Sequence, residues 1–185
     1  ARRGVGGSHI RNLVANGRFE TDLTGWVSYG TGTIAKVAGG RSGAACVEVT
    51  STGTATVGLN DNPDWTTGTI AGQRYRLSAW VRSTVTTAGT SRLRIYELQG
   101  STQQGATIYS GDVTLSATWQ QVTADVIVAK TGSTIDLHVT SSPTASTSKF
   151  QIDDVQIQLI PPGAAAMIAG AATDGEAPRG NEIDA

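Results

Sequence analysis

The chain is 185 residues long, 16% of them are charged, and its formal net charge is −1. That length suits a single domain with enough chain to bury a substantial core. The charges form no basic cluster or stripe, which argues against a nucleic-acid-binding protein. No apolar run approaches the roughly 20 residues that a membrane span requires, so we expect no membrane partner.

The first element is the stretch NLVANGRFETDLTGW, residues 12–26. It mixes an apolar start, an Asn-Gly pair, a lone glutamate and a Gly-Trp pair. We expect residues 13–14 to begin a core strand, the pair at 16–17 to form a turn, and Phe19 to pack inward. The glutamate is the residue of this stretch whose role needs an explanation.

From this stretch to about residue 161 the chain has the pattern of short β-strands. The segments are rich in β-branched and aromatic residues, most alternate apolar with polar residues, and Gly, Asn, Asp, Ser or Pro separates them. This regular punctuation predicts an all-β domain, residues 12–161, built as a two-sheet antiparallel β-sandwich. We expect strands at 33–39, 45–51, 54–60, 74–84, 91–99, 112–129, 134–141 and 149–160.

Two extended arms flank this domain, residues 1–11 and 162–185. The N-terminal arm carries arginines and no acid, whereas acids predominate in the C-terminal arm. Alanines at 163–172 favour a helix, but the glycines there oppose it. Arms of this composition become ordered when something holds them, so we expect them to contact other protein subunits.

Alternation also sorts side chains onto the two faces of three predicted strands. Aliphatic residues occupy one face of each and must form the core. The opposite faces carry Trp80, Arg82, Arg94, Tyr96 and His138. If these strands are neighbours, the residues form an aromatic and polar platform on which sugar rings can stack. The alternative is that Trp80 and Tyr96 lie beneath a loop as a second small core.

A catalytic function finds little support in the sequence. Glycoside hydrolysis needs two opposed carboxylates, and nothing marks Glu97 and Asp136, which can face a cleft, as such a pair. No nucleophile-elbow pattern accompanies His138, the one histidine of the domain. Cys46 is the single cysteine, which excludes an internal disulfide, and we expect it to be buried. We therefore expect a non-catalytic protein.

Five stretches in order resemble the jelly-roll carbohydrate-binding modules that accompany xylanases and cellulases, the group of families four, nine and twenty-two. They are NLVANGRFETDLTGW, GGRSGAACVEVTS, GQRYRLSAWVRS, ATWQQVTADVIV and FQIDDVQIQL. The resemblance covers about residues 12–159. It implies a jelly roll that binds a polysaccharide or cell-surface glycan without catalysis.

The resemblance implies a structural calcium ion. Its ligands would be Glu20, from the opening stretch, and Asp153, with Asp154 adjacent, from the closing stretch. Calcium prefers oxygen ligands, and carboxylates from both ends of the domain would tie those ends together. Asp153 is in phase with Val155, so we expect it to point inward. The alternative is that Glu20 makes hydrogen bonds or a charge interaction without an ion.

The resemblance also implies a sugar site on a concave sheet. Matching strands would place Trp80, Arg82, Arg94, Tyr96 and His138 in this site. Trp65 and Tyr109, on loops, would form its rim, because an exposed ring at Trp65 would be unusual without a ligand. We assign the two other tryptophans, at positions 26 and 119, to packing.

Similar opening stretches occur in tail and other virion proteins of phages that infect actinobacteria. This resemblance implies an alternative function, a phage virion structural protein of the tail or capsid decoration. The jelly roll and its arms would then make subunit contacts or attach the particle to a host surface. The expected location is extracellular or in the virion.

Overall fold

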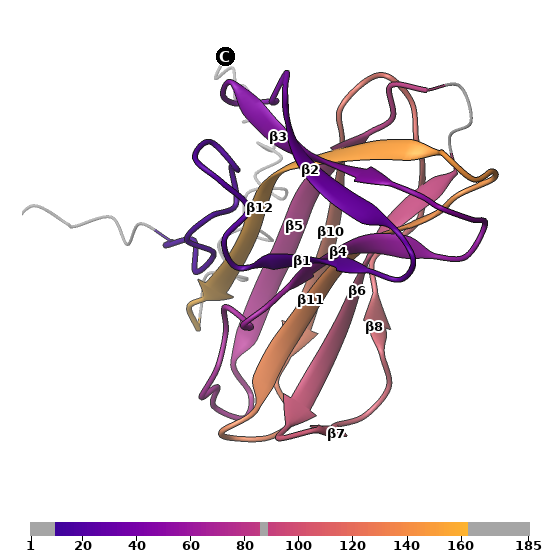
Figure 1. Ribbon diagram of the computed structural model, residues 1–185. Coiled ribbons are helices and arrows are strands. Elements are labelled where there is room, and N and C mark those ends of the chain that lie inside the picture. Colours follow the sequence, from indigo (N-terminus) through magenta and orange to yellow (C-terminus); the bar gives the residue numbers. More distant parts are fainter. Residues whose placement is uncertain (1–9, 86–88, 163–185) are drawn as a thin grey trace, which may run out of the picture.

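The computed structural model describes residues 10–85 and 89–162. Within these ranges the regular secondary structure consists of β-strands, and no helix is present (Figure 1). None of the elements in these ranges is a helix of the length and apolar character that crossing a bilayer requires. The candidate helix at 163–172 and most of both arms lie outside the described residues. The described strands are β1 (Trp26–Tyr29), β2 (Thr33–Ala38), β3 (Ala45–Thr50), β4 (Val57–Asp61), β5 (Arg74–Arg82), β6 (Thr90–Gln99), β7 (Thr102–Gln103), β8 (Ile108–Tyr109), β9 (Val113–Thr114), β10 (Gln120–Ile127), β11 (Thr134–Ser142) and β12 (Lys149–Ile160).

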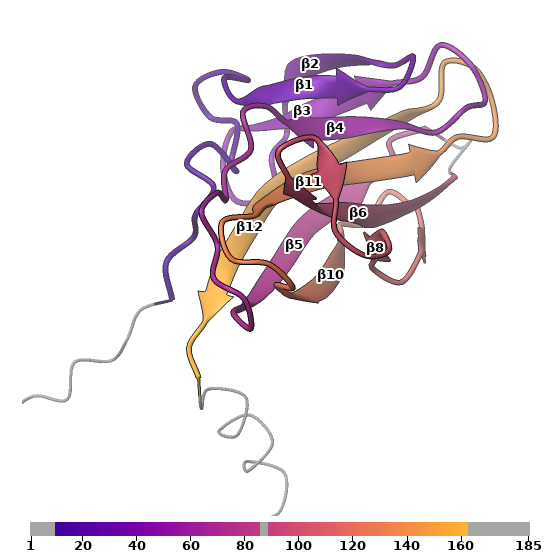
Figure 2. The same cartoon turned by 90° about the horizontal axis from the view of Figure 1, so that it is seen from below.

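The strands form two antiparallel sheets that face each other as layers (Figure 2). The larger sheet has seven strands in the order β1-β4-β11-β6-β7, with β8 and β9 also paired to β6. The smaller sheet has five strands in the order β10-β5-β12-β3-β2. The predicted two-sheet β-sandwich is therefore confirmed.

The core lies between the two sheets and follows the predicted alternation. The aliphatic faces of β5, β6 and β11 are completely buried. Removing these side chains from water is the main favourable contribution to folding. The residues concerned are Leu77, Ala79, Val81, Leu93, Ile95, Ile135, Leu137 and Val139.

All eight expected strands are present, but one was predicted too long. The expected strand at 112–129 is divided into β9 and β10, because the chain passes from one sheet to the other at residues 115–119. A hydrogen bond from Ser83 N to the Ser116 carbonyl, 2.8 Å long, holds this connection. The short strands β1, β7 and β8 were not expected. They are too brief to carry an alternation pattern.

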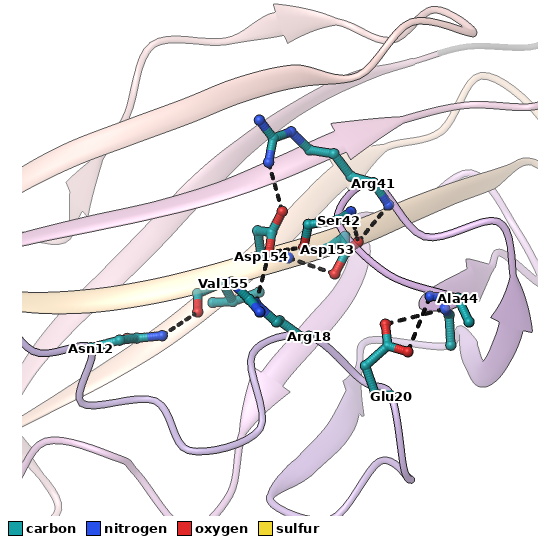
Figure 3. A network of polar contacts seen from close by, with 10 residues as sticks. Asn12, Arg18, Glu20, Arg41, Ser42, Ala44, Asp153, Asp154 and Val155 are labelled. Atoms are coloured by element: carbon teal, nitrogen blue, oxygen red, sulfur yellow. Dashed lines mark hydrogen bonds and ion pairs between the residues drawn. The ribbon is translucent and has the colours of Figure 1, made fainter.

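The opening stretch does not begin a core strand as expected. It lies along β12 and joins it through the Asn12–Gln158 bridge. Asn12 Nδ2 donates to Val155 O at 3.1 Å (Figure 3), and Val155 N donates to Gly17 O at 2.8 Å. Phe19 is fully buried as predicted. The two ends of the domain are thus joined by backbone and amide hydrogen bonds.

A β-bulge interrupts β12 between Asp153 and Gln156. Ile152 before the bulge, Val155 within it and Ile157 after it all belong to the buried core. The expected inward phase of Asp153 is therefore wrong, because the bulge inserts an extra residue and Asp153 pairs with Trp80 at an outward position. Asp153 is nevertheless completely buried, since the loop at residues 39–44 covers it.

We expect Gly17→Ala to destabilise the protein by about 1–3 kcal/mol through overpacking. A Cβ at this position would lie 2.1 Å from Val155 O, so the opening stretch would have to move away from β12. Urea denaturation measures the change. The control is Gly53→Ala, because a Cβ at Gly53 meets nothing within 4 Å. Equal urea midpoints for the two variants would contradict a close contact between Gly17 and Val155 of β12.

Candidate functional site

The outer surface of the larger sheet carries a group of aromatic and cationic side chains. Strand β11 lies between β4 and β6, and His138 stands opposite Arg94 on one side and Asn60 on the other. Tyr109 of β8 pairs with Arg94 from the far side of β6. We call this group the aromatic face, and its members are Tyr29, Arg92, Arg94, Tyr96, Tyr109 and His138.

Mutual contacts hold the centre of the aromatic face in place. The His138 ring lies 4.7 Å from the Tyr29 ring and 5.3 Å from the Tyr96 ring, measured between centroids. The Arg94 guanidinium lies 5.0 Å from the Tyr96 ring and donates a hydrogen bond to the Tyr29 hydroxyl. Burial raises the pKa of the Tyr96 hydroxyl, which therefore remains a neutral donor and acceptor.

Tyr109, which we expected on a loop, lies on β8 and forms the open edge of this face. It is 44% exposed, and the Arg92 guanidinium lies 4.2 Å from its ring centroid. Arg92 also forms an ion pair with Asp112 at 3.5 Å. The edge therefore combines an accessible ring with charged groups that can reach a ligand.

Trp80 and Arg82 do not join this face, contrary to the expectation from alternation. They lie on β5, whose outward side belongs to the smaller sheet, because β5 pairs with β10 and β12. The Arg41 guanidinium covers the Trp80 ring at 3.7 Å. Arg82 is held by Gln151 Oε1 at 2.8 Å and stacks on Trp119 at 4.5 Å. The alternative that Trp80 lies beneath a loop describes its surroundings better.

Trp65 is not the exposed rim residue that its polar surroundings suggested. Its side chain is half-buried and packs against the core, with its ring 6.2 Å from the Trp26 ring. A Cβ on Gly25 would come within 2.4 Å of it, so the glycine makes room for the indole. The residue packs where β1 begins and extends the core at that end.

The expected calcium ligands form a network around the loop at 39–44 (Figure 3). The Glu20 carboxylate accepts hydrogen bonds from the amides of Ala44 and Ala45. Asp153 Oδ2 accepts from Arg41 N at 2.6 Å and from Ser42 N at 3.3 Å. These contacts fasten the loop to the opening stretch on one side and to β12 on the other.

The neighbouring Asp154 is satisfied by cations of the protein. Its carboxylate pairs with the guanidinium groups of Arg41 at 2.7 Å and Arg18 at 3.5 Å, and it accepts from the Ser42 hydroxyl. Burial raises the pKa of the neighbouring Asp153, whose carboxylate has no exposed surface.

In this arrangement the three carboxylates do not surround one shared point. Calcium takes six to eight oxygen ligands around one point. The carboxylates of Glu20, Asp153 and Asp154 form no group whose ligand atoms come within 4.8 Å of one another among the described residues. Amide and guanidinium donors occupy them instead. Calcium binding at these residues stays a prediction from the resemblance.

A different set of carboxylates does converge, beside the aromatic face. One ligand atom each of Asp61, Asp64 and Asp136 lies within 4.8 Å of the others. Burial, reinforced by the neighbouring acids, raises the pKa of Asp61 to about 8, although hydrogen bonds from Trp65 N and Leu137 N oppose this. Burial and the Asp136 charge raise the pKa of Asp64 to about 6. The sequence analysis did not single out this cluster.

Glu97 and Asp136, the two acids considered from the sequence, do not form an opposed pair at a cleft. Glu97 is buried and accepts hydrogen bonds from Ala129 N and Lys130 N, so it cannot pair with Asp136 at a cleft. The Asp61 carboxylate accepts hydrogen bonds from the backbone amides of Trp65 and Leu137. Cys46 is buried as predicted, and desolvation raises the pKa of its thiol to about 11, which makes it a poor nucleophile.

Two members of the aromatic face were missed from the sequence. Tyr29 lies at the end of β1, a strand of four residues. Val27 and Tyr29 are two residues apart, and this spacing would have placed Tyr29 on the same strand face as Val27. Arg92 lies on the same face of β6 as Arg94 and Tyr96, so extending the predicted alternation by one step would have found it.

Comparison with known proteins agrees with this architecture. The family model CBM_4_9, described as a carbohydrate binding domain, matches residues 11–147. Among curated proteins, no sequence matches the chain.

Several solved structures share the fold. The CBM22-1-GH10 modules of endo-1,4-beta-D-xylanase 10B from Clostridium thermocellum, complexed with xylohexaose, give a TM-score of 0.62 at 22% identity. The CBM22-1 xylan-binding domain of Xyn10C from Paenibacillus barcinonensis gives 0.63 at 16% identity. The enzymatically active domain of tailspike protein 4 from bacteriophage CBA120 gives 0.61 at 16% identity.

These matches cover 78%, 83% and 80% of this chain, respectively. The chain spans 28% of the xylanase chain and 21% of the tailspike chain, but 97% of the isolated xylan-binding domain. At such identities the likeness establishes the fold alone. The family model, in contrast, matches more than half of the sequence. The protein therefore belongs to the carbohydrate binding domain family CBM_4_9.

Proposed function

We propose that the chain is a non-catalytic module that binds a polysaccharide on the aromatic face of its larger sheet. The observation that carries the proposal is the convergence of three tyrosine rings, two arginines and His138 on the outer side of adjoining strands. An outer sheet surface without a ligand would be expected to carry mostly solvated Lys, Glu and Thr side chains. Here the rings and cations are instead ordered by one another.

The chemistry of this face suits a carbohydrate. Tyrosine rings offer flat apolar surfaces for the C–H faces of sugar rings, and they lose little conformational entropy when they bind. Arginine supplies a fixed fork of donors for hydroxyl groups.

The substrate class that we propose is a β-1,4-linked polysaccharide such as xylan. The support is the similarity in fold to a xylan-binding domain and to a module solved with xylohexaose. An extended polysaccharide could lie along the aromatic face, because this face runs across β4, β11, β6 and β8. We place the protein outside the cell, where such polymers occur.

Calorimetric titration of the full chain with xylohexaose tests this proposal. We expect the wild type to bind and Tyr96→Ala to weaken binding at least about tenfold, a loss of about 1.4 kcal/mol. Tyr96→Phe keeps the ring and should retain most of the affinity. Trp80→Ala, on the smaller sheet, serves as a second control and should bind like the wild type.

Two results would contradict the proposal. Absence of binding to xylohexaose and to a broader glycan panel would remove the carbohydrate function. Normal binding by Tyr96→Ala together with loss in Trp80→Ala would move the site to the smaller sheet. A thermal melt of each variant identifies any loss of binding that comes from unfolding.

We also propose an alternative context, a virion protein of a phage that uses the same domain for subunit contacts or host attachment. Its support is the similar domain in a phage tailspike protein. The arms proposed to contact other subunits, residues 1–11 and 162–185, lie largely outside the described residues.

Light scattering of the full chain and of residues 12–161 tests the role of the arms. If the arms hold subunits together, the full chain should form oligomers and the shortened chain should be a monomer. Equal subunit numbers in both would contradict assembly through the arms, and this result would leave the glycan proposal unaffected.

A further inference from the structure

The cluster of Asp61, Asp64 and Asp136 lies where β4 ends beside β11. Asp61 is the last residue of β4, Asp64 lies in the loop that follows, and Asp136 comes from β11. Asp61 is 1% exposed, and the two others are half-buried. Their ligand atoms lie within 4.8 Å of one another, so three carboxylates share a space with restricted access to water.

No lysine or arginine neutralises this cluster, and its one potentially cationic partner among the described residues is His138, whose Nε2 lies 2.9 Å from Asp136 Oδ1. Among the described residues, neither lysine nor arginine forms an ion pair with any of the three acids. Asp154 differs in this respect, because it pairs with two guanidinium groups. Like charges at such distances in a partly buried site are unfavourable unless a cation or protons compensate them.

Independent evidence comes from buried polar atoms around the cluster that lack partners. His138 is 5% exposed, and neither of its ring nitrogens makes a hydrogen bond. Its Nε2 lies 2.9 Å from Asp136 Oδ1, which is the distance of an ion pair, but no hydrogen bond joins the two atoms. The hydroxyl of Thr66, 4% exposed, and Oδ1 of Asn60 are likewise unpartnered. Buried groups of this kind normally have partners.

We propose that Asp61, Asp64 and Asp136 bind a divalent cation of the calcium class. Calcium lies 2.3–2.6 Å from its oxygen ligands, so oxygen atoms on opposite sides of one ion are roughly 4.6–5.2 Å apart. The separation within this cluster, at most 4.8 Å, agrees with that span. Asn60 offers a further oxygen on the adjoining outward position of β4.

A cation here would fasten the loop after β4 to the larger sheet. Asp61 already accepts hydrogen bonds from Trp65 N at 3.1 Å and from Leu137 N at 2.7 Å, and so it connects the loop to β11. A bound ion would add Asp64 to this connection. It would also lie beside His138 and set the position of this ring within the aromatic face.

The test is calorimetric titration of the full chain with calcium chloride after treatment with a chelator. We expect the wild type to bind calcium and the double variant Asp64→Asn, Asp136→Asn to bind at least about tenfold more weakly. Asp112→Asn is the matched control, because Asp112 is an exposed acid that pairs with Arg92. It should bind like the wild type.

Thermal melts separate loss of binding from loss of folding. In chelator the double variant should melt at or above the wild-type temperature, because it removes charges that repel one another. In excess calcium the wild type should gain stability and the double variant should not. These readouts use no sugar, so their outcome is separate from that of the glycan proposal.

Either of two results would overturn the inference. One is a wild-type chain that binds no calcium. The other is undiminished binding by the folded double variant. If a Glu20→Gln, Asp153→Asn variant abolishes binding while the Asp64 and Asp136 substitutions do not, the ion belongs at the residues implied by the family resemblance.

Discussion

Backbone hydrogen bonding of β11 to β4 on one side and to β6 on the other decides which side chains share the outer surface of the larger sheet. The pairing places His138 opposite Asn60 and Arg94, and Asp136 opposite Tyr96. A slip of one residue would exchange the buried aliphatic side chains for these polar ones, so burial of the core fixes the register. The same constraint therefore specifies the core, the aromatic face and the position of Asp136.

The two groups of buried acids differ in their partners. At the bulge of β12, Asp153 and Asp154 are matched by amides of the covering loop and by arginine side chains, and the loop is held as a result. At the end of β4, Asp61 has two amide partners, but among the described residues neither lysine nor arginine pairs with the acids around it. In the first arrangement, amides and guanidinium groups of the protein contact both acids. The second is the one that a cation would complete, and it adjoins the face proposed to bind sugar.

Strand positions and core faces were predictable because alternation along a strand depends on local sequence. The partners of each strand were not, because sheet order depends on contacts between distant segments. Trp80 and Tyr96 have the same pattern in the sequence, yet β5 and β6 lie in different sheets. The bulge at Asp153 was equally hidden, since an extra residue changes the phase without a sequence signal. The convergence of Asp61 and Asp136 likewise required the fold, since 75 positions separate them.

The central claim is that carbohydrate binds to the outer surface of the larger sheet. The most direct measurement follows backbone amide shifts of the isotope-labelled full chain by nuclear magnetic resonance during titration with xylohexaose. We expect the largest changes in β4, β11, β6 and β8, around Tyr96 and Arg94. Changes concentrated in β5, β12 and β3, or no saturable change at all, would contradict this claim.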